Sequence, residues 1–236
     1  MELKPLVLPV DLRDAERSGA LDLYPPDDLT ERVPAVLIVH GGPVPAAVRP
    51  TPRDWPVYRS YASLLAGRGV LAATVDHRLH HPGAYPEAAI DVRAAADAVR
   101  ADPRVDGDRL AIWMFSGGGL IAADWLREPP PWLRVLALTY PVLAAYPGWP
   151  DNPRFRPAEA VAGAGDLPIV LTRVGREDPA VAVGVAAFVT AATDAGANLE
   201  IIDVPDGQHG FDYLDDDDVS RAAIVRSIDL VLEGLH

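Results

Sequence analysis

The sequence predicts an α/β fold built on a mostly parallel sheet of eight strands with an antiparallel N-terminal edge. Short apolar runs rich in β-branched residues alternate along the chain with longer stretches of helical periodicity, which is typical of repeated β-α units. Hydrophobic residues make up 49% of the 236 positions and charged residues 23%, so the chain can bury the core that such a sheet needs.

Eight apolar runs are predicted as strands. The first two contain Pro9 and alternating polar residues, which suits an exposed antiparallel edge, whereas the later runs are apolar throughout, as expected of buried parallel strands. The runs are residues 5–12, 20–24, 35–39, 70–75, 110–115, 133–140, 169–174 and 199–204.

Five stretches are predicted as helices. In residues 85–100, alanine and valine recur at spacings of three and four with charges on the opposite face, which indicates a helix packed on the sheet. The others are residues 55–65, 117–127, 181–195 and 219–235. Residues 141–167 carry five prolines in their first seventeen positions, so they cannot form one long helix or a large cap domain. With no linker or repeat, we expect one domain over residues 1–236.

Composition excludes several classes of protein. The chain has 21 Lys+Arg against 34 Asp+Glu, a net charge of −13, which argues against nucleic-acid binding. It has no cysteine, which excludes disulfides, thiolate nucleophiles and Cys-ligated metals. Neither a leader-like start nor a membrane-length apolar run is present, so we expect no membrane partner and a cytoplasmic location.

Ser116 is the strongest candidate for catalysis. It follows the predicted strand 110–115 directly and is followed by three glycines and a helical segment. A serine on a sharp strand-to-helix turn projects its hydroxyl, and the amides of the helix start can stabilise a developing oxyanion. The same residues could also be a simple helix cap.

The sequence His40-Gly41-Gly42-Pro43 comes immediately after another predicted strand. Glycines at the carboxyl end of a strand leave backbone amides uncovered, where α/β folds bind ligands. Alone, these residues could be an ordinary turn. Together with Ser116 they predict an oxyanion site, because acyl transfer needs two amides that converge on one oxygen.

Asp178 and His209 follow the next two predicted strand ends. A serine hydroxyl becomes a good nucleophile when an imidazole takes its proton, and the imidazole needs a carboxylate to orient it. Ser116, Asp178 and His209 fit these three roles in chain order. If Asp178 were not the acid, Asp212 or Asp206 would be the next candidates.

These residues resemble the α/β-hydrolase superfamily, and more closely its small esterases and acylhydrolases related to dienelactone hydrolase and to prolyl-oligopeptidase-like domains. The resemblance covers residues 40–42, 75–79, 106–111, the Gly175-x-x-Asp178 stretch and His209-Gly-Phe-Asp. It implies an α/β-hydrolase fold with helices on both faces of the sheet. It also implies Ser116 as nucleophile, Asp178 as acid and His209 as base, with oxyanion amides at Gly117 and near Gly41 or Gly42.

The resemblance further implies a serine hydrolase that cleaves carboxylic esters through an acyl-enzyme, without a cofactor. The short, proline-broken stretch 141–167, with Tyr146 and Trp149 closing one side of the pocket, predicts small or short-chain acyl groups. Met114 stands where the family has a small residue and is expected to crowd the turn. Two alternatives remain. Met114 favours an impaired hydrolase-fold protein that binds a small molecule. The other alternative is a small peptidase or acylaminoacyl hydrolase. The sequence leaves open whether the chain forms a homo-oligomer.

The remaining candidates concern the substrate pocket and metals. Five aromatic residues could line an acyl pocket near His40, and because most aromatics belong to the core we expect about two of them to touch substrate. They are Trp55, Tyr58, Phe115, Tyr146 and Trp149. His77, His80 and His81 could suggest zinc, but adjacent side chains tend to diverge and no carboxylate has ligand-like spacing. We therefore expect no metal site.

Overall fold

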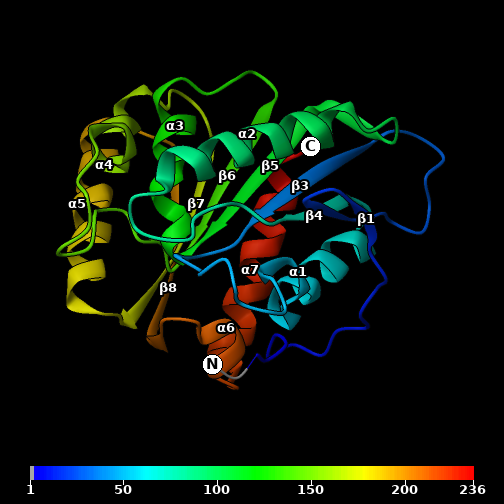
Figure 1. Ribbon diagram of the computed structural model, residues 1–236, viewed down its shortest axis with the longest axis horizontal. Helices are drawn as coiled ribbons and strands as arrows, with labels where there is room; N and C mark the ends of the chain where they lie inside the picture. The colour runs from blue at the N-terminus through cyan, green and yellow to red at the C-terminus, as the bar shows by residue number, and fades with distance from the viewer. Residues whose placement is uncertain (1–2) are drawn as a thin grey trace.

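The computed structural model describes residues 3–236, in which an eight-stranded sheet lies between two layers of helices (Figure 1). One face of the sheet is covered by α1 (Pro56–Gly67) and α7 (Asp218–Gly234). The other face is covered by α2 (Tyr85–Ala101), α3 (Ala122–Arg127) and α5 (Pro179–Asp194). The predicted helices on both faces are confirmed.

The sheet has the order β1-β2-β4-β3-β5-β6-β7-β8. The strands are β1 (Glu16–Ser18), β2 (Leu21–Tyr24), β3 (Val33–Val39), β4 (Leu71–Val75), β5 (Val105–Phe115), β6 (Leu133–Thr139), β7 (Ile169–Arg176) and β8 (Leu199–Gln208). The β1–β2 and β2–β4 pairs are antiparallel, and all other pairs are parallel. The predicted mixed sheet with an antiparallel N-terminal edge is therefore confirmed.

The first predicted strand, residues 5–12, is wrong. These residues form no strand, and the edge strand is β1 instead. Pro5 and Pro9 lack the N–H groups that a ladder requires. Leu6 is buried instead against the α1 and α7 layer, and Val7 N–H donates to the carbonyl of Asp212 at 2.9 Å.

Alternating side chains of β5 reach both helical layers. Trp113 and Phe115 are buried in the layer of α1 and α7, whereas Ile112 and Met114 are buried in the layer of α2 and α3. All four are fully shielded from solvent. The central strand that ends at Ser116 is thus held from both sides, which suits a rigidly placed side chain.

The shorter elements lie in the connections. They are η1 (Pro52–Asp54), η2 (Ser116–Ile121), η3 (Pro153–Phe155), α4 (Pro157–Ala160), η4 (Val161–Gly163) and α6 (Phe211–Leu214). The predicted helix 117–127 is therefore a 3-10 turn followed by α3. Residues 141–167 contain only η3, α4 and η4, which confirms that they form no long helix.

The carboxyl ends of β3, β5, β6, β7 and β8 meet at one edge of the sheet because these strands are parallel. The strands that follow β3 in the chain lie on its two sides, β4 on one and β5 on the other. Such a reversal of strand order opens a crevice beyond the strand ends. None of the helices in residues 3–236 combines the length and hydropathy of a membrane span.

Candidate active site

Ser116 lies on a tight turn between β5 and η2, with a backbone φ of +49°. This left-handed conformation is unfavourable for a residue with a side chain and is typical of functional turns. Gly117 permits the turn, because a Cβ atom there would overlap the carbonyl oxygen of Gly42. The backbone of residues 41–42 and the start of η2 are therefore in direct contact.

His209 follows β8 and faces the serine. Its Nε2 atom lies 2.7 Å from Ser116 Oγ, and its Nδ1 atom lies 2.8 Å from Glu177 Oε2. The side chain of Glu177 is 5% exposed and that of His209 is 35% exposed. The three residues form a continuous hydrogen-bonded chain from a buried carboxylate to an accessible hydroxyl.

Asp178, predicted to orient the histidine, has different partners. Its carboxylate accepts a hydrogen bond from the hydroxyl of Tyr146 at 2.6 Å and caps α5 by accepting from Ala180 N–H at 2.8 Å. The bond from Tyr146 lowers the pKa of this exposed carboxyl group. The prediction of Asp178 as the partner of His209 is corrected to Glu177. An acid directly before a proline at a helix start commonly caps the helix. This sequence signal could have assigned Asp178 to the helix cap and left Glu177 as the partner of His209.

The loop after β3 lies against the serine. A Cβ atom on Gly41 would fall 2.8 Å from Ser116 Cβ and 3.3 Å from Ser116 Oγ, so only glycine allows this approach. Gly41 N–H donates to the hydroxyl oxygen of Tyr58 at 3.1 Å. Gly42 and Pro43 continue along the wall of a cavity that contains Ser116. Gly41 and Gly42 thus lie where the sequence predicts them, beside the candidate nucleophile.

His40 lies beneath this loop rather than in the cavity. Its ring stacks on His77 with centroids 3.7 Å apart and an angle of 11° between planes, and its Nδ1 atom contacts the carbonyl of Gly41. His77 Nε2–H donates to the carbonyl of His40 at 3.0 Å, and Leu79 N–H donates to His77 Nδ1 at 3.3 Å. Burial lowers the pKa of His77 to about 4 and that of His40 well below its usual value. Two neutral imidazoles therefore support the glycine loop.

A cavity of about 280 Å³ opens onto Ser116 and His209. Its other walls come from the N-terminal segment, the glycine loop, the region of α1, Tyr140 after β6, and α6. The lining residues are Leu3, Lys4, Gly41, Gly42, Pro43, Val44, Trp55, Val57, Tyr58, Ser116, Tyr140, His209 and Tyr213. The volume is close to the lower limit of about 300 Å³ for small-molecule sites.

Three residues expected at the pocket do not line it. Phe115 is fully buried beneath the site, with its ring 5.4 Å from that of Tyr58. Tyr146 is bonded to Asp178, and Trp149 packs on Tyr85 and Tyr146. Residues 141–167 thus lie beside α2 and α5. The aromatic wall comes from Trp55 and Tyr58, which were among the expected aromatics, and from Tyr140 and Tyr213, which sequence reasoning missed.

A fully buried acid lies behind the histidine. Asp212 on α6 accepts hydrogen bonds from the hydroxyls of Tyr61 and Tyr140, each at 3.0 Å. Burial raises the pKa of Asp212 to about 7, although both hydroxyls favour its charged form. The ring of Tyr140 lies 4.8 Å from that of His209. This cluster holds one side of the imidazole in place.

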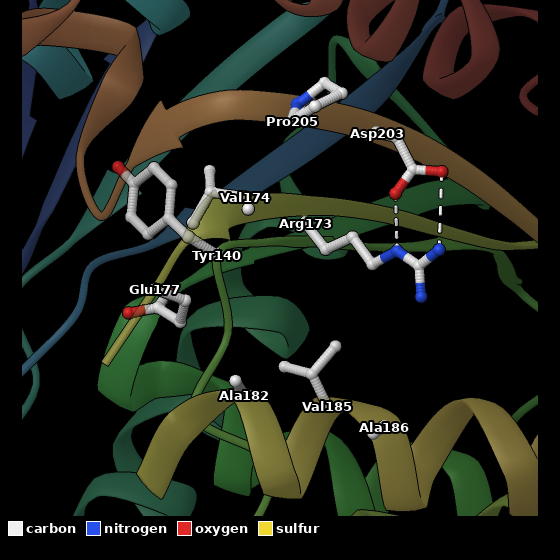
Figure 2. Close-up of a pocket in the computed structure, with 10 residues that line it drawn as sticks. Tyr140, Arg173, Val174, Glu177, Ala182, Val185, Ala186, Asp203 and Pro205 are labelled. Carbon is white, nitrogen blue, oxygen red and sulfur yellow. Dashed lines mark hydrogen bonds and ion pairs between the residues drawn. The ribbon is translucent and has the colours of Figure 1, made fainter. Parts of the chain in front are cut away.

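A second cavity of about 310 Å³ lies behind Glu177, between the ends of β7 and β8 and helix α5 (Figure 2). Ala182, Val185 and Ala186 of α5 face it, and the ion pair of Arg173 with Asp203 lies along its far side. Ser116 and His209 do not line this cavity. Glu177 and Tyr140 do line it, so the second cavity lies on the side of the acid and the first on the side of the serine.

Met114 does not enter the turn. It is fully buried among the residues under α2 and α3. Gly117 and Gly118 accommodate the loop after β3 rather than Met114, since a Cβ on Gly118 would fall 2.8 Å from the carbonyl oxygen of His40. Gly119 accommodates the segment after β6, since a Cβ there would fall 2.7 Å from the carbonyl oxygen of Val142.

The histidines at 77, 80 and 81 diverge as expected. His80 Nδ1 lies 2.9 Å from the carbonyl of Val44, and His81 Nδ1 accepts from Gly83 N–H at 3.2 Å. His77 is turned inward beneath the glycine loop. In residues 3–236, no group of three histidines and acids is arranged to hold a metal ion.

The comparisons agree with this architecture. The BD-FAE family model matches residues 21–124. The chain is similar to esterase 2 of Thermogutta terrifontis with propionate bound, at 18% identity and a TM-score of 0.71 over 97% of this chain and 96% of that one. The chain therefore has the α/β-hydrolase fold of these esterases. A search of curated proteins finds no match to the sequence.

A larger α/β-hydrolase-like structure is also similar. Dipeptidyl peptidase 4 of Porphyromonas gingivalis has 17% identity and a TM-score of 0.69 over 98% of this chain but 36% of that one. The native form of the Thermogutta esterase gives 19% identity and a TM-score of 0.69 over 99% and 94% of the two chains. At these identities the likeness establishes the fold, and the chemistry of this chain must be argued from its own residues.

Proposed function

We propose that the chain is a serine carboxylic-ester hydrolase in which Ser116 is the nucleophile, His209 the general base and Glu177 the acid. The observation that carries the proposal is the hydrogen-bonded chain from Glu177 through His209 to Ser116, with a hydroxyl presented on a turn of positive φ. Each residue follows the carboxyl end of a different strand, as in other sites built on parallel sheets.

In the first half of the reaction, Ser116 Oγ forms a bond to the carbonyl carbon of the ester and its proton passes to His209 Nε2. The carbonyl oxygen takes the negative charge, and the backbone amide of Gly117 at the start of η2 donates to it in this proposal. When the tetrahedral intermediate collapses, the alcohol leaves with the proton from His209. Glu177 stabilises the imidazolium while it exists.

In the second half, His209 takes a proton from water, and the resulting attack on the acyl-serine releases the acid and restores Ser116. The cavity of about 280 Å³ favours small or short-chain acyl groups. The similar Thermogutta structures include an esterase with propionate bound and one phosphorylated by paraoxon, which supports a serine esterase with a small acyl substrate.

The test is covalent labelling with a fluorophosphonate, followed by mapping of the adduct. We expect wild-type protein to be labelled at Ser116 and to hydrolyse 4-nitrophenyl butyrate, and Ser116→Ala to lose labelling and to lower kcat by about 10⁴-fold or more. Ser18→Ala, on exposed β1, is the control and should retain both properties. Unlabelled wild-type protein at high probe concentration would instead support a non-catalytic binder.

A 4-nitroanilide of a short peptide tests the peptidase alternative in the same assay. Anilide cleavage faster than butyrate cleavage would replace the esterase assignment, although it would keep the same three residues.

A further inference from the structure

Tyr58 of α1 forms part of the wall of the Ser116 cavity, yet the hydrogen bond it makes faces the glycine loop. Its side chain is 5% exposed, and its hydroxyl oxygen accepts the N–H of Gly41 at 3.1 Å. A phenolic hydroxyl can accept and donate at the same time. Because the oxygen is used as an acceptor, the O–H hydrogen is left as a donor.

The bond from Gly41 also changes which groups can stabilise an oxyanion. The single N–H of Gly41 is occupied by Tyr58, Pro43 has no N–H, and Val44 N–H donates to the carbonyl of Leu79 at 2.8 Å. The peptide of Gly42 is packed against Gly117. The loop after β3 therefore offers neither Gly41 N–H nor Val44 N–H as an open amide.

The position of the Tyr58 hydroxyl suits it to replace Gly41 N–H as a donor to the oxyanion. Gly41 lies so close to Ser116 that a Cβ atom would contact Oγ at 3.3 Å, and the Tyr58 hydroxyl is one hydrogen bond away from Gly41 in the same cavity. Burial raises the pKa of Tyr58, so the phenol remains protonated at neutral pH. Within residues 3–236 no group accepts the hydroxyl hydrogen of Tyr58. A buried donor with no acceptor is costly in the free enzyme and becomes favourable when negative charge develops beside it.

Resting on the function proposed above, we propose that the Tyr58 hydroxyl is an oxyanion donor of this site, acting with Gly117 N–H in place of the Gly41 amide. During attack by Ser116, the carbonyl oxygen gains charge and accepts a hydrogen bond from Tyr58 O–H, and no proton is transferred. Gly41 N–H strengthens this donor by drawing electron density from the phenolic oxygen.

The first test is Tyr58→Phe, measured with 4-nitrophenyl butyrate. We expect kcat to fall by about 100-fold while KM changes by less than about threefold, because the lost bond forms mainly in the transition state. The control is Tyr24→Phe, which removes another buried phenolic hydroxyl from β2, outside the cavity, and should leave kcat unchanged. A kcat for Tyr58→Phe within about threefold of wild type would overturn the assignment.

A second variant separates donation to the oxyanion from support of the loop. Replacing Tyr58 by 3-fluorotyrosine makes the phenol a stronger donor and a weaker acceptor while the ring stays in place. We expect kcat to equal or exceed that of wild type, whereas a hydroxyl that only holds Gly41 N–H would give a lower kcat. This variant also keeps the assignment testable if Tyr58→Phe does not fold.

The two levels of the proposal fail in different ways. If the wild-type protein is labelled at Ser116 and active, but both Tyr58 variants behave contrary to expectation, only the assignment of Tyr58 is wrong. If the wild-type protein neither hydrolyses the ester nor is labelled, the esterase function and the role of Tyr58 are both wrong.

Discussion

Two adjacent acids after β7 offer a direct test of the site, because Glu177 faces His209 and Asp178 faces Tyr146 and α5. We expect Glu177→Gln to inactivate the enzyme and Asp178→Asn to leave it nearly unchanged. Each substitution removes one negative charge and keeps the approximate size of the side chain. The pair therefore compares the positions of two carboxylates rather than their chemistry.

The expected loss for Glu177→Gln follows from the geometry. The carboxylate lies 2.8 Å from His209 Nδ1 and is 5% exposed, so it stabilises the imidazolium through a short bond that water screens weakly. At an effective dielectric constant of about 20, two unit charges about 4 Å apart interact by about 4 kcal/mol. That corresponds to about 10³-fold in kcat, and a glutamine amide that donates to Nδ1 would favour the wrong tautomer and lower it further.

Asp178→Asn should behave differently. Asparagine caps helices about as well as aspartate, with its amide oxygen accepting from Ala180 N–H, and its amide NH2 can donate to the hydroxyl oxygen of Tyr146. We expect kcat/KM within about threefold of wild type and a small change in Tm. The assay is hydrolysis of 4-nitrophenyl butyrate, with Tm measured on each variant. The reasoning would be refuted if Glu177→Gln kept more than about a tenth of wild-type kcat, or if Asp178→Asn were the more damaging change.

Three further predictions follow from the cavity and from buried groups. 4-Nitrophenyl butyrate should be cleaved much faster than the palmitate ester at equal monomer concentration, and a rate increase above the critical micelle concentration of palmitate would contradict the small cavity. Asp212 binds its proton more tightly in the folded state, so its contribution to stability is lost as pH rises toward its folded pKa of about 7. The free energy of unfolding of wild type relative to Asp212→Asn should therefore fall by about 2–3 kcal/mol between about pH 5 and pH 8 in urea titrations, and a pH-independent difference would disprove this. The pKa of His77 is lowered to about 4, so its effect on stability changes with pH in the opposite direction. The free energy of unfolding of wild type relative to His77→Gln should rise by about 2 kcal/mol between about pH 4.5 and pH 7. A constant difference would show that His77 is not buried in its neutral form.

Local chemistry made much of the sheet predictable. Seven of the eight apolar runs overlap observed strands, because buried parallel strands require continuous apolar residues that little else in a chain requires. The run that failed, residues 5–12, contains Pro5 and Pro9 and packs its apolar side chains beside α6 and α7 instead. Hydropathy shows that a segment is buried but not which surface covers it.

The acid of the site illustrates the limit of motif spacing. Glu177 and Asp178 are adjacent, and a change of one residue reverses the direction in which a side chain leaves an extended backbone. Because β7 extends to Arg176 and α5 begins at Pro179, Asp178 falls at the cap and Glu177 turns toward His209. The exact end of a strand depends on its neighbour β8, which the sequence of β7 does not contain.

The sequence by itself determined the fold class and the positions of Ser116, the glycine loop and His209, because each needs particular residues at the end of a strand. Only the tertiary structure decided which acid lies behind the histidine and which aromatic residues line the cavity: Glu177 in place of Asp178, and Trp55 and Tyr58 of the five candidate aromatics together with Tyr140 and Tyr213. These residues come from separate parts of the chain and meet only where packing of helices on the sheet brings them together. Short-range patterns record local conformation, whereas a pocket is formed by contacts between distant segments.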